Sequence, residues 1–395
     1  MAITYMKLSE FDYNLPKHFI AQTPCEPRDH SKLMVLDRAA GKIEHKKFYD
    51  IGEFLKKGDV LVVNNSKVMA ARLFGRKSTG AQVEILLLSD ISKDRNMGLI
   101  KQESKTRGTI SPRNDADSNA EFTRKNIWQV LVRSAKRLRA GDEIMIDKEK
   151  TTPNPSLVRR GVYPIKMKIL KELEEGIRLV QFNEDIVKDL DAIGTVPLPP
   201  YIKSDNVNTF KERYQTVYSK ILGSAAAPTA GLHFTPELIT NLKKKGVIFK
   251  EVLLHIGLDT FRPMAVENIE EHKIHKEYCE LDEKTAEFLT KAKKDGRRII
   301  AVGTTAARVL ESVFDQNGKF KPFKGWTGIF IYPGYKFKAI DALITNFHLP
   351  KSSLLLMVSA FCGNDNGRKL IIKAYEEAKN HNYRFFSFGD AMMIV

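Results

Sequence analysis

The sequence is poor in cysteine: Cys25, Cys279 and Cys362 are its three cysteines in 395 residues. They are odd in number and far apart along the chain, so they suggest neither a disulfide framework nor a cysteine-rich metal site. The same spacing excludes an iron–sulfur cluster held by three neighbouring cysteines. We therefore expect a protein of a reducing compartment.

Long apolar segments are lacking as well. The longest, residues 354–362, is interrupted by Ser359 and is far too short to cross a bilayer. The first ten residues contain no extended apolar stretch of the kind found in a secretion signal. The sequence thus predicts a cytoplasmic protein that does not span a membrane.

Acidic residues are fewer than basic ones, 48 against 64, which gives a formal net charge of +16. A field of this sign raises the local concentration of phosphates and speeds their encounter with the protein. The composition therefore predicts a polyanionic partner, with nucleic acid as the first candidate and a membrane surface as the second. With 43% apolar residues, the chain can also bury a large core, in two domains rather than one.

Short strands dominate residues 69–184, where turn signals separate them and no helix-length periodicity competes. Such a series favours a small antiparallel β-barrel, because a closed barrel leaves no exposed edge. Residues 101–124 are polar and charged, and we expect them to form a mobile insertion in this domain. The expected strands are 70–76, 82–88, 127–133, 143–147, 166–170 and 177–182.

From residue 185 onward, strand and helix patterns alternate, which is typical of an α/β core. Residues 1–68 are expected to complete this core. The predicted fold class is therefore α/β: a mixed α/β core domain of residues 1–68 and 185–395, with the small antiparallel β-barrel of residues 69–184 inserted into it. The expected elements are strands at 247–254 and 298–302, helices at 283–295, 305–314 and 366–380, and a final strand around 383–388.

Residues 225–238 place a loop of small residues directly before a helix start. Thr235 suits the N-cap, Pro236 suits the first helical position, and Gly246 suits the end of the helix. The loop before Thr235 would then face free backbone amides and the positive end of the helix dipole, an arrangement that binds anions. The alternative is a tight connection to a capped helix with no ligand.

A second segment of this kind is residues 298–308, a buried strand that runs into Gly303 before a helix. Hydroxyls of Thr304 and Thr305 and the helix amides would lie at the carboxyl end of the strand, where ligands bind in α/β sheets. A capping role for either threonine is the alternative. Arg308, one turn into the helix, could reach an anion or face solvent.

The nine histidines differ in their surroundings. His233 and His348 lie in turns of the kind that present reactive groups, whereas His255 follows an apolar run and suits a core position. His272, His275 and Glu277 are spaced as metal ligands could be, but the sequence places no further ligand beside them, so we expect no metal.

Basic residues gather between 91 and 180, where 20 Lys or Arg stand against 12 Asp or Glu. Arg133, Lys136, Arg137 and Arg139 cluster at the end of an expected strand, which suits contact with phosphates. The alternative is a basic face that only contacts solvent. Tyrosines could stack on unpaired bases or belong to the core; they are Tyr201, Tyr214, Tyr218, Tyr332 and Tyr335.

Motifs along nearly the whole chain resemble the S-adenosylmethionine:tRNA ribosyltransferase-isomerase family of queuosine biosynthesis. They run in order from near residue 10 to the end. The resemblance implies a mixed α/β domain with an inserted β-barrel domain, in agreement with the reading above. The motifs lie at 62–65, 71–76, 197–202, 214–218, 228–234, 301–305, 330–335, 345–350 and 383–392.

The resemblance also implies an activity. The ribosyl group of S-adenosylmethionine would be transferred and isomerised onto the aminomethyl group of 7-aminomethyl-7-deazaguanine at the tRNA wobble position. Adenine and methionine would leave, and an epoxycyclopentane, the epoxyqueuosine side chain, would remain on the tRNA. The sulfonium acidifies the ribose C5′ hydrogens, so that a base can start the reaction by forming an ylide. We expect no prosthetic group, no membrane partner and a monomer.

Site residues follow from this chemistry and from the motifs. Histidine suits the proton transfers because its ordinary pKa lies near neutral pH, and asparagine and tyrosine suit ribose hydroxyls and adenine edges. The expected catalytic residues are His233, His348 and His275. The expected cosubstrate-binding residues are Asn64, Asn65, Thr229, Gly231, Gly303, Thr304, Thr305, Arg308, Tyr332 and Asn346. The expected tRNA-binding residues are Arg72, Arg133, Lys136, Arg137 and Arg139.

Two positions depart from the family pattern. Asp259 stands where a glycine is expected, and residues 66–69 replace the more usual Thr-Arg-Val before Pro.

Two other functions remain as alternatives. An S-adenosylmethionine-dependent tRNA methyltransferase would share both substrates, but the chain has no Gly-x-Gly-x-x-Gly loop. A non-catalytic RNA-binding protein would explain the charge and the barrel, but it would leave the two loop-to-helix segments unexplained.

Overall fold

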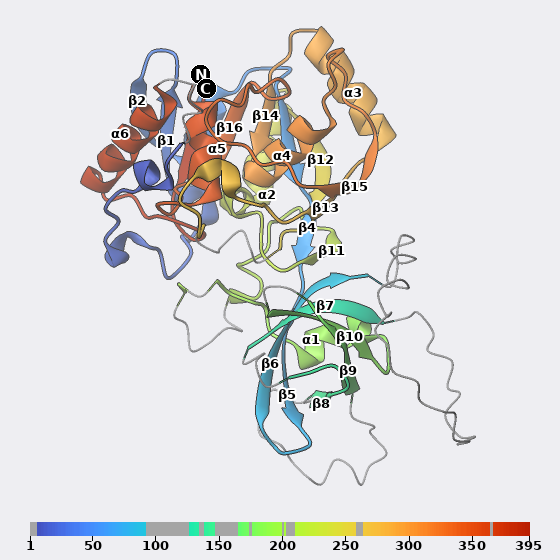
Figure 1. Cartoon of the computed structure of the whole chain (residues 1–395). Helices are drawn as coiled ribbons and strands as arrows, with labels where there is room; N and C mark the ends of the chain where they lie inside the picture. Colours follow the sequence, from blue (N-terminus) through green and yellow to red (C-terminus); the bar gives the residue numbers. More distant parts are fainter. Residues whose placement is uncertain are drawn as a thin grey trace, which may run out of the picture. The chain divides into compact units, whose positions relative to one another are not determined.

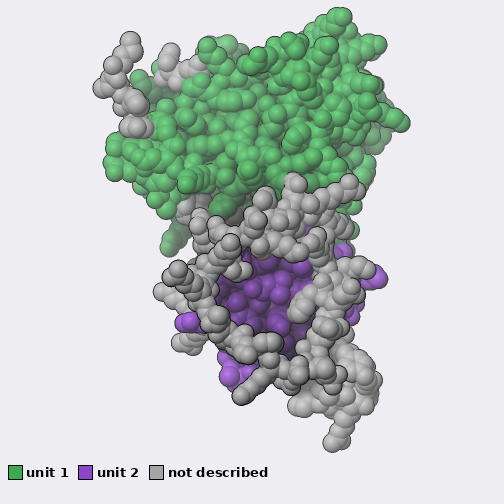
Figure 2. Space-filling view, turned by 45° about the vertical axis from the view of Figure 1, so that its right-hand side comes forward, with its two compact units in different colours: residues 1–69, 198–395 green, residues 70–197 purple. Residues whose placement is uncertain are grey.

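A computed structural model describes residues 6–91, 126–133, 138–146, 165–173, 176–199, 201–202, 210–257, 264–363 and 366–395. The chain forms two compact units (Figure 1, Figure 2). The first comprises residues 1–69 and 198–395, and the second comprises residues 70–197. Residues 101–124, expected as an insertion, and Asp259 lie outside the described residues.

The second unit is a closed barrel of six antiparallel strands in the order β10-β7-β6-β5-β8-β9, which confirms the predicted barrel. Alternate side chains point inward, as in β8, where Ile144 and Ile146 are buried and their neighbours are not. Gly75 of β5 allows close pairing with β8, because a Cβ at this position would lie 2.6 Å from the carbonyl oxygen of Met145. The strands are β5 (Arg72–Lys77), β6 (Gln82–Asp90), β7 (Ile127–Val132), β8 (Glu143–Ile146), β9 (Ile165–Glu172) and β10 (Ile177–Phe182).

The second unit extends to residue 197, beyond residue 184, where the sequence pattern predicts the end of the barrel domain. This extension contains a 3₁₀ turn (Ile186–Lys188) and the short helix α1 (Leu190–Ile193). Thr195 exchanges two backbone hydrogen bonds with Arg72 of β5, at 2.8 and 3.0 Å, so the segment is tied to the barrel.

The first unit contains a nine-stranded sheet in the order β15-β13-β12-β3-β14-β16-β17-β1-β2. Its middle strands β12, β3, β14 and β16 run parallel, and β3, β14 and β16 are wholly buried. Parallel strands of this kind are covered on both faces. The strands are β1 (Lys32–Asp37), β2 (Lys42–Lys47), β3 (Val60–Asn64), β12 (Ile248–Leu254), β13 (Glu277–Leu281), β14 (Ile299–Val302), β15 (Phe323–Thr327), β16 (Ala342–Asn346) and β17 (Ala391–Ile394); β4 (Ser66–Val68) and β11 (Ile221–Ser224) form a separate pair.

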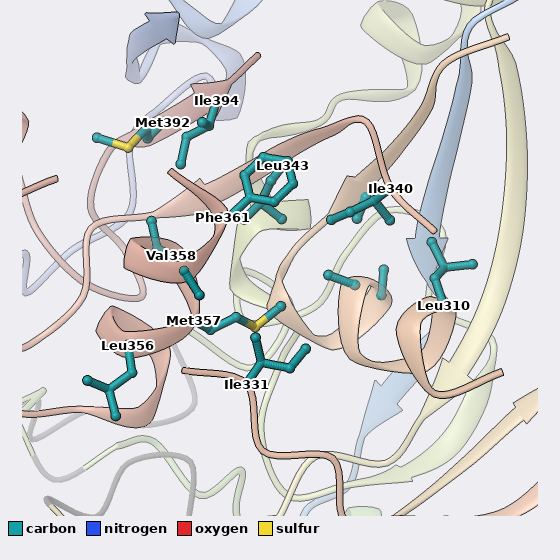
Figure 3. Packing of buried hydrophobic residues seen from close by; sticks show 14 of the residues in the cluster. Leu310, Ile331, Ile340, Leu343, Leu356, Met357, Val358, Phe361, Met392 and Ile394 are labelled. Carbon is teal, nitrogen blue, oxygen red and sulfur yellow. The ribbon is translucent and has the colours of Figure 1, made fainter. Parts of the chain in front are cut away.

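Two apolar cores lie on the two faces of this sheet. In β3, Val60 and Val62 belong to one core, and Leu61 and Val63 belong to the other, as strand alternation requires. Figure 3 shows the larger core, in which side chains of α4 and α5 gather with those of β16 and β17. Helices α3 (Glu283–Lys294), α4 (Thr304–Val313), α5 (Ser353–Phe361) and α6 (Gly367–Asn380) contribute to the larger core, and α2 (Pro236–Lys244) contributes to the other.

The final strand differs from the prediction. It is β17 at 391–394 and not a strand around 383–388. Phe386 has a φ of 76°, which is incompatible with an extended strand. The Asp390 carboxylate accepts the backbone amides of Arg384 at 2.8 Å and Lys32 at 3.0 Å, so the segment closes into a loop before β17 begins. None of the described helices is long and apolar enough to cross a membrane.

Candidate active site

A cleft opens in the first unit at the carboxyl ends of β14 and β16, where ligands bind in α/β sheets. It encloses about 490 Å³, its open mouth included. The chain segments that meet there are distant in sequence, and two of them directly follow or end a strand: Gly303 follows β14, and Thr345 and Asn346 end β16. The lining residues are Ala227, Pro228, Thr229, Ala230, Ile256, Gly303, Thr304, Thr305, Thr345, Asn346, His348, Leu354, Phe386 and Ser387.

The start of α4 forms one wall of the cleft. Gly303 is the N-cap and has a φ of 91°, a conformation that glycine adopts without strain. No side chain caps this helix, so its first backbone amides have no partner within it. The hydroxyl of Thr305 is buried and has no hydrogen-bond partner. This wall therefore offers several donors and the positive end of a helix dipole.

Arg308 lies one turn along α4 and is 8% exposed. Its Nη1 forms an ion pair with the buried carboxylate of Glu277, and its Nε donates to the carbonyl of Ile329 at 3.3 Å. The remaining nitrogen, Nη2, is buried and has no hydrogen-bond partner. The other oxygen of Glu277 accepts the amide of Gly257 at 3.0 Å, so this carboxylate is fully engaged.

His348 lines the cleft and is held from three sides. Its Nε2 lies 2.9 Å from the Thr345 hydroxyl, its amide donates to the Tyr375 hydroxyl at 3.1 Å, and its carbonyl accepts the Tyr13 hydroxyl. Burial lowers the pKa of His348 to about 3, so the ring is neutral at physiological pH. Its Nδ1 forms no hydrogen bond with a described residue.

His233 lies beside the cleft, behind Asn346, and both of its ring nitrogens are engaged. The Thr229 hydroxyl donates to the Asn346 carbonyl oxygen at 2.8 Å, so the amide nitrogen of Asn346 faces Nε2 of His233, 3.2 Å away. Nε2 is then the acceptor, and Nδ1 carries the proton toward the Ser31 hydroxyl at 2.7 Å. Burial, followed by nearby Arg384 and Arg28, lowers the pKa of His233 to about 3.

The start of α2, expected as an anion site, has the predicted Thr235 cap and also a carboxylate beside it. Residues 229–233 form a 3₁₀ turn, and Thr235 caps α2 by accepting the amide of Leu238 at 3.1 Å. The same hydroxyl donates to the Asp29 carboxylate at 3.1 Å. A negative group of the chain itself therefore lies beside this helix start, and it disfavours an anionic ligand at that point.

Several expected cosubstrate residues do not line the cleft. Asn64 is fully buried, and its amide group bonds to the backbone of Leu254 and Ser66, which joins the ends of β3 and β12. Asn65 donates to Glu251 at 3.1 Å. Gly231 lies under Tyr218, since a Cβ at this position would come within 2.0 Å of the tyrosine hydroxyl. Tyr332, whose ring lies 5.1 Å from that of Phe330, packs against the larger core. His275 is also absent from the lining.

The cleft also contains residues that sequence reasoning missed, above all Phe386 and Ser387. Phe386 holds its positive φ because its own backbone groups are both fixed by hydrogen bonds. Its amide donates to the carbonyl of Phe347 at 3.1 Å, and its carbonyl accepts the amide of Gly389 at 3.1 Å. Tyr201 packs against the Phe386 ring at 4.1 Å and bonds to the Ser387 hydroxyl. Such backbone strain gathers at functional sites, but no local sequence signal announces it.

Potential metal ligands lie close together at few places in the part of the chain that the structure describes. Glu277 of the His272, His275 and Glu277 pattern is engaged by Arg308. One other group, His45, Glu377 and His381, brings three ligand atoms within 4.8 Å of one another. The two histidine rings of that group stack at 4.1 Å and 19°, so their in-plane lone pairs do not aim at one ion, and we assign no metal to it.

The basic residues of the barrel are partly paired. Arg72 and Arg133 both contact the Glu84 carboxylate, at 3.1 and 3.2 Å, and the Arg133 side chain is 82% exposed. Arg139 is exposed next to the turn at Asp142. Lys136 and Arg137 lie outside the described residues.

A family model, curated relatives and a solved structure all point to the same protein family. A family model described as "Queuosine biosynthesis protein" matches residues 8–394. An S-adenosylmethionine:tRNA ribosyltransferase-isomerase of Desulfitobacterium hafniense is 47% identical over 393 residues, covering 99% of this chain and 100% of the relative. One of the same name from Acetivibrio thermocellus is 46% identical over 394 residues, covering 98% and 100%. A crystal structure of S-adenosylmethionine tRNA ribosyltransferase from Thermotoga maritima matches with a TM-score of 0.50 and 36% identity, covering 98% and 100%.

Proposed function

Since the chain belongs to the family of queuosine biosynthesis proteins, we propose that it catalyses the S-adenosylmethionine:tRNA ribosyltransferase-isomerase reaction. The observation that carries this function is the similarity over nearly full length to relatives of that name. The reaction transfers the ribosyl group of S-adenosylmethionine to the aminomethyl group of 7-aminomethyl-7-deazaguanine at the wobble position of tRNA. Adenine and methionine leave, and epoxyqueuosine-tRNA is formed.

S-adenosylmethionine occupies the cleft at the ends of β14 and β16. The neutral hydroxyl and amide groups of Thr229, Thr345 and Asn346 gather on one side, where they can bond ribose hydroxyls without a change of charge. Asn64, Asn65, Gly231 and Tyr332 act on this cleft through packing and hydrogen bonds within the fold. The enzyme needs no prosthetic group for this chemistry, and it works as a monomer.

His348 is the first candidate for the base that removes a C5′ proton. It lines the cleft, burial keeps it neutral, and Nδ1 forms no bond with a described residue. A neutral imidazole with a free ring nitrogen is the form that accepts a proton. His233 is a positioning residue in this scheme, because its two nitrogens fix Ser31 and Asn346. His275 ranks last, since it does not line the cleft.

The tRNA is bound through the basic residues of the barrel. Exposed Arg133 and Arg139 are suited to phosphate contact, and Arg72 shares Glu84 with Arg133. Lys136 and Arg137 extend the same sequence cluster. A modifying enzyme must also reach its base, which anticodon loops present unstacked.

Product analysis tests this function. With tRNA carrying the aminomethyl-deazaguanine base, we expect one adenine and one methionine per modified tRNA. Label in the ribose of S-adenosylmethionine should enter the RNA, and label in its methyl group should not. Deuterium at C5′ should be lost to solvent or slow the reaction. Formation of S-adenosylhomocysteine together with methyl-labelled tRNA would contradict the proposal and identify a methyltransferase.

A further inference from the structure

The start of α4 differs from the starts of α2, α3 and α5. Side chains of Thr235, Asp282 and Ser352 cap α2, α3 and α5 by accepting a backbone amide. In α4 the N-cap is Gly303, which has no side chain to do so, and Gly303, Thr304 and Thr305 of this start line the cleft. Its amides therefore remain available to a ligand.

A second observation comes from the side chains of the first turns. Thr305 is 8% exposed, lines the cleft, and its hydroxyl has no hydrogen-bond partner. An unpaired buried hydroxyl costs free energy unless a ligand or water completes it. Arg308, also 8% exposed, lies one turn further along outside the cleft lining; its charge is paired with Glu277, and its Nη2 has no hydrogen-bond partner. The backbone amides can only donate and the Thr305 hydroxyl can donate as well, so together with the positive dipole end they suit an anion.

The charge of the cosubstrate then decides which anion this is. S-adenosylmethionine carries a single anionic group, the carboxylate of its methionine half. On the basis of the function proposed above, we propose that the start of α4, with the Thr305 hydroxyl, binds this carboxylate. The positive end of the helix dipole stabilises a negative group there and disfavours the sulfonium. The sulfonium and the ribose therefore lie away from α4, toward Asn346 and His348.

The test compares three ligands by calorimetry: S-adenosylmethionine, its decarboxylated analogue, and 5′-methylthioadenosine, which lacks the whole amino-acid portion. The wild-type protein should bind S-adenosylmethionine roughly 10-fold or more tightly than the decarboxylated analogue, the difference that a charge-assisted hydrogen-bond site provides. Thr305→Val, which removes the hydroxyl at nearly constant shape, should weaken S-adenosylmethionine binding by roughly 10-fold and leave 5′-methylthioadenosine binding unchanged.

Two further variants complete the design. Thr305→Ser restores a hydroxyl and should restore the affinity for S-adenosylmethionine. Ser312→Ala removes a hydroxyl from the same helix, where it bonds to the Arg308 carbonyl at 2.7 Å outside the cleft lining, and should change neither ligand. Equal binding of S-adenosylmethionine and its decarboxylated analogue would overturn the proposal. So would a Thr305→Val variant that loses both ligands equally. If wild-type protein binds no S-adenosylmethionine at all, the proposed function itself fails.

Discussion

Acid should destabilise the first unit through two buried histidines. Burial lowers the pKa of His233 and of His348 to about 3, whereas an unfolded chain binds a proton on each ring below about pH 6.5. The folded state therefore holds both rings neutral over a range in which the unfolded state is protonated. Their contribution to stability is fully present above pH 6.5 and is lost as the pH falls from 6.5 toward 3.

The size of the effect follows from the same values. Between pH 7 and pH 5 each neutral ring should reduce the free energy of unfolding by about 2 kcal/mol, and the two together by about 4 kcal/mol. This is a large share of the roughly 5–15 kcal/mol that stabilises a domain. Because pH 5 lies well above both folded pKa values, the result does not depend on their exact position.

Urea unfolding at pH 5, 6 and 7 measures this dependence. The exposed Trp326 of β15 reports on the first unit once Trp128 of the barrel is replaced by phenylalanine. His233→Gln and His348→Gln should each make the decrease in the free energy of unfolding between pH 7 and pH 5 smaller by about 2 kcal/mol. His18→Gln, at an exposed position, is the matched control and should leave the fall unchanged. If the free energy of unfolding decreases as much in His233→Gln and in His348→Gln as in the wild-type protein, this account is refuted.

The other predictions concern activity and binding. His348→Gln should reduce turnover by about 10² to 10⁴ and abolish hydrogen exchange at C5′, whereas His233→Gln should mainly raise the KM for S-adenosylmethionine. If single-turnover adenine release is slowed more by His233→Gln than by His348→Gln, His233 is the base. Replacing Arg133, Lys136, Arg137 and Arg139 by glutamate should weaken tRNA binding and reduce its salt slope by roughly one per lost phosphate contact, and an unaltered slope would exclude this surface. Chelators should leave turnover intact, because His272, His275 and Glu277 are expected to act without metal; chelator-sensitive zinc at stoichiometric level would disprove this.

The features that the sequence predicts correctly depend on residues close together along the chain. The barrel strands alternate between buried and exposed residues, and β8 and β9 match their predicted ranges to within a few residues. Residue type was also enough for the cap of α2, because Thr235 and Pro236 act through neighbours three or four residues away. The final strand was misplaced because the positive φ of Phe386 depends on bonds to distant residues and not on its own side chain.

The site was harder to predict because its parts meet only in the folded chain. The Asp29 carboxylate that reaches Thr235 lies 206 residues away in sequence, and the backbone that engages Asn64 lies 190 residues away. A motif shows which side chains are present but not which of them have already found partners. Gly303, Thr304 and Thr305 could be identified because helix start and strand end are adjacent in sequence. The sequence could not show which of His233 and His348 lines the cleft.

The strand order of the first unit also sets the order in which the chain can fold during synthesis. β17, at residues 391–394, lies between β16 and β1, with parallel pairing to β1 and antiparallel pairing to β16. The sheet therefore stays in two pieces until these residues have left the ribosome. The barrel uses strands from residues 72–182 only, so it can close while the ribosome is still making the first unit. The unit proposed to bind tRNA would thus mature before the unit that contains the cleft, and a chain that stops short of β17 would keep an intact barrel and an open sheet.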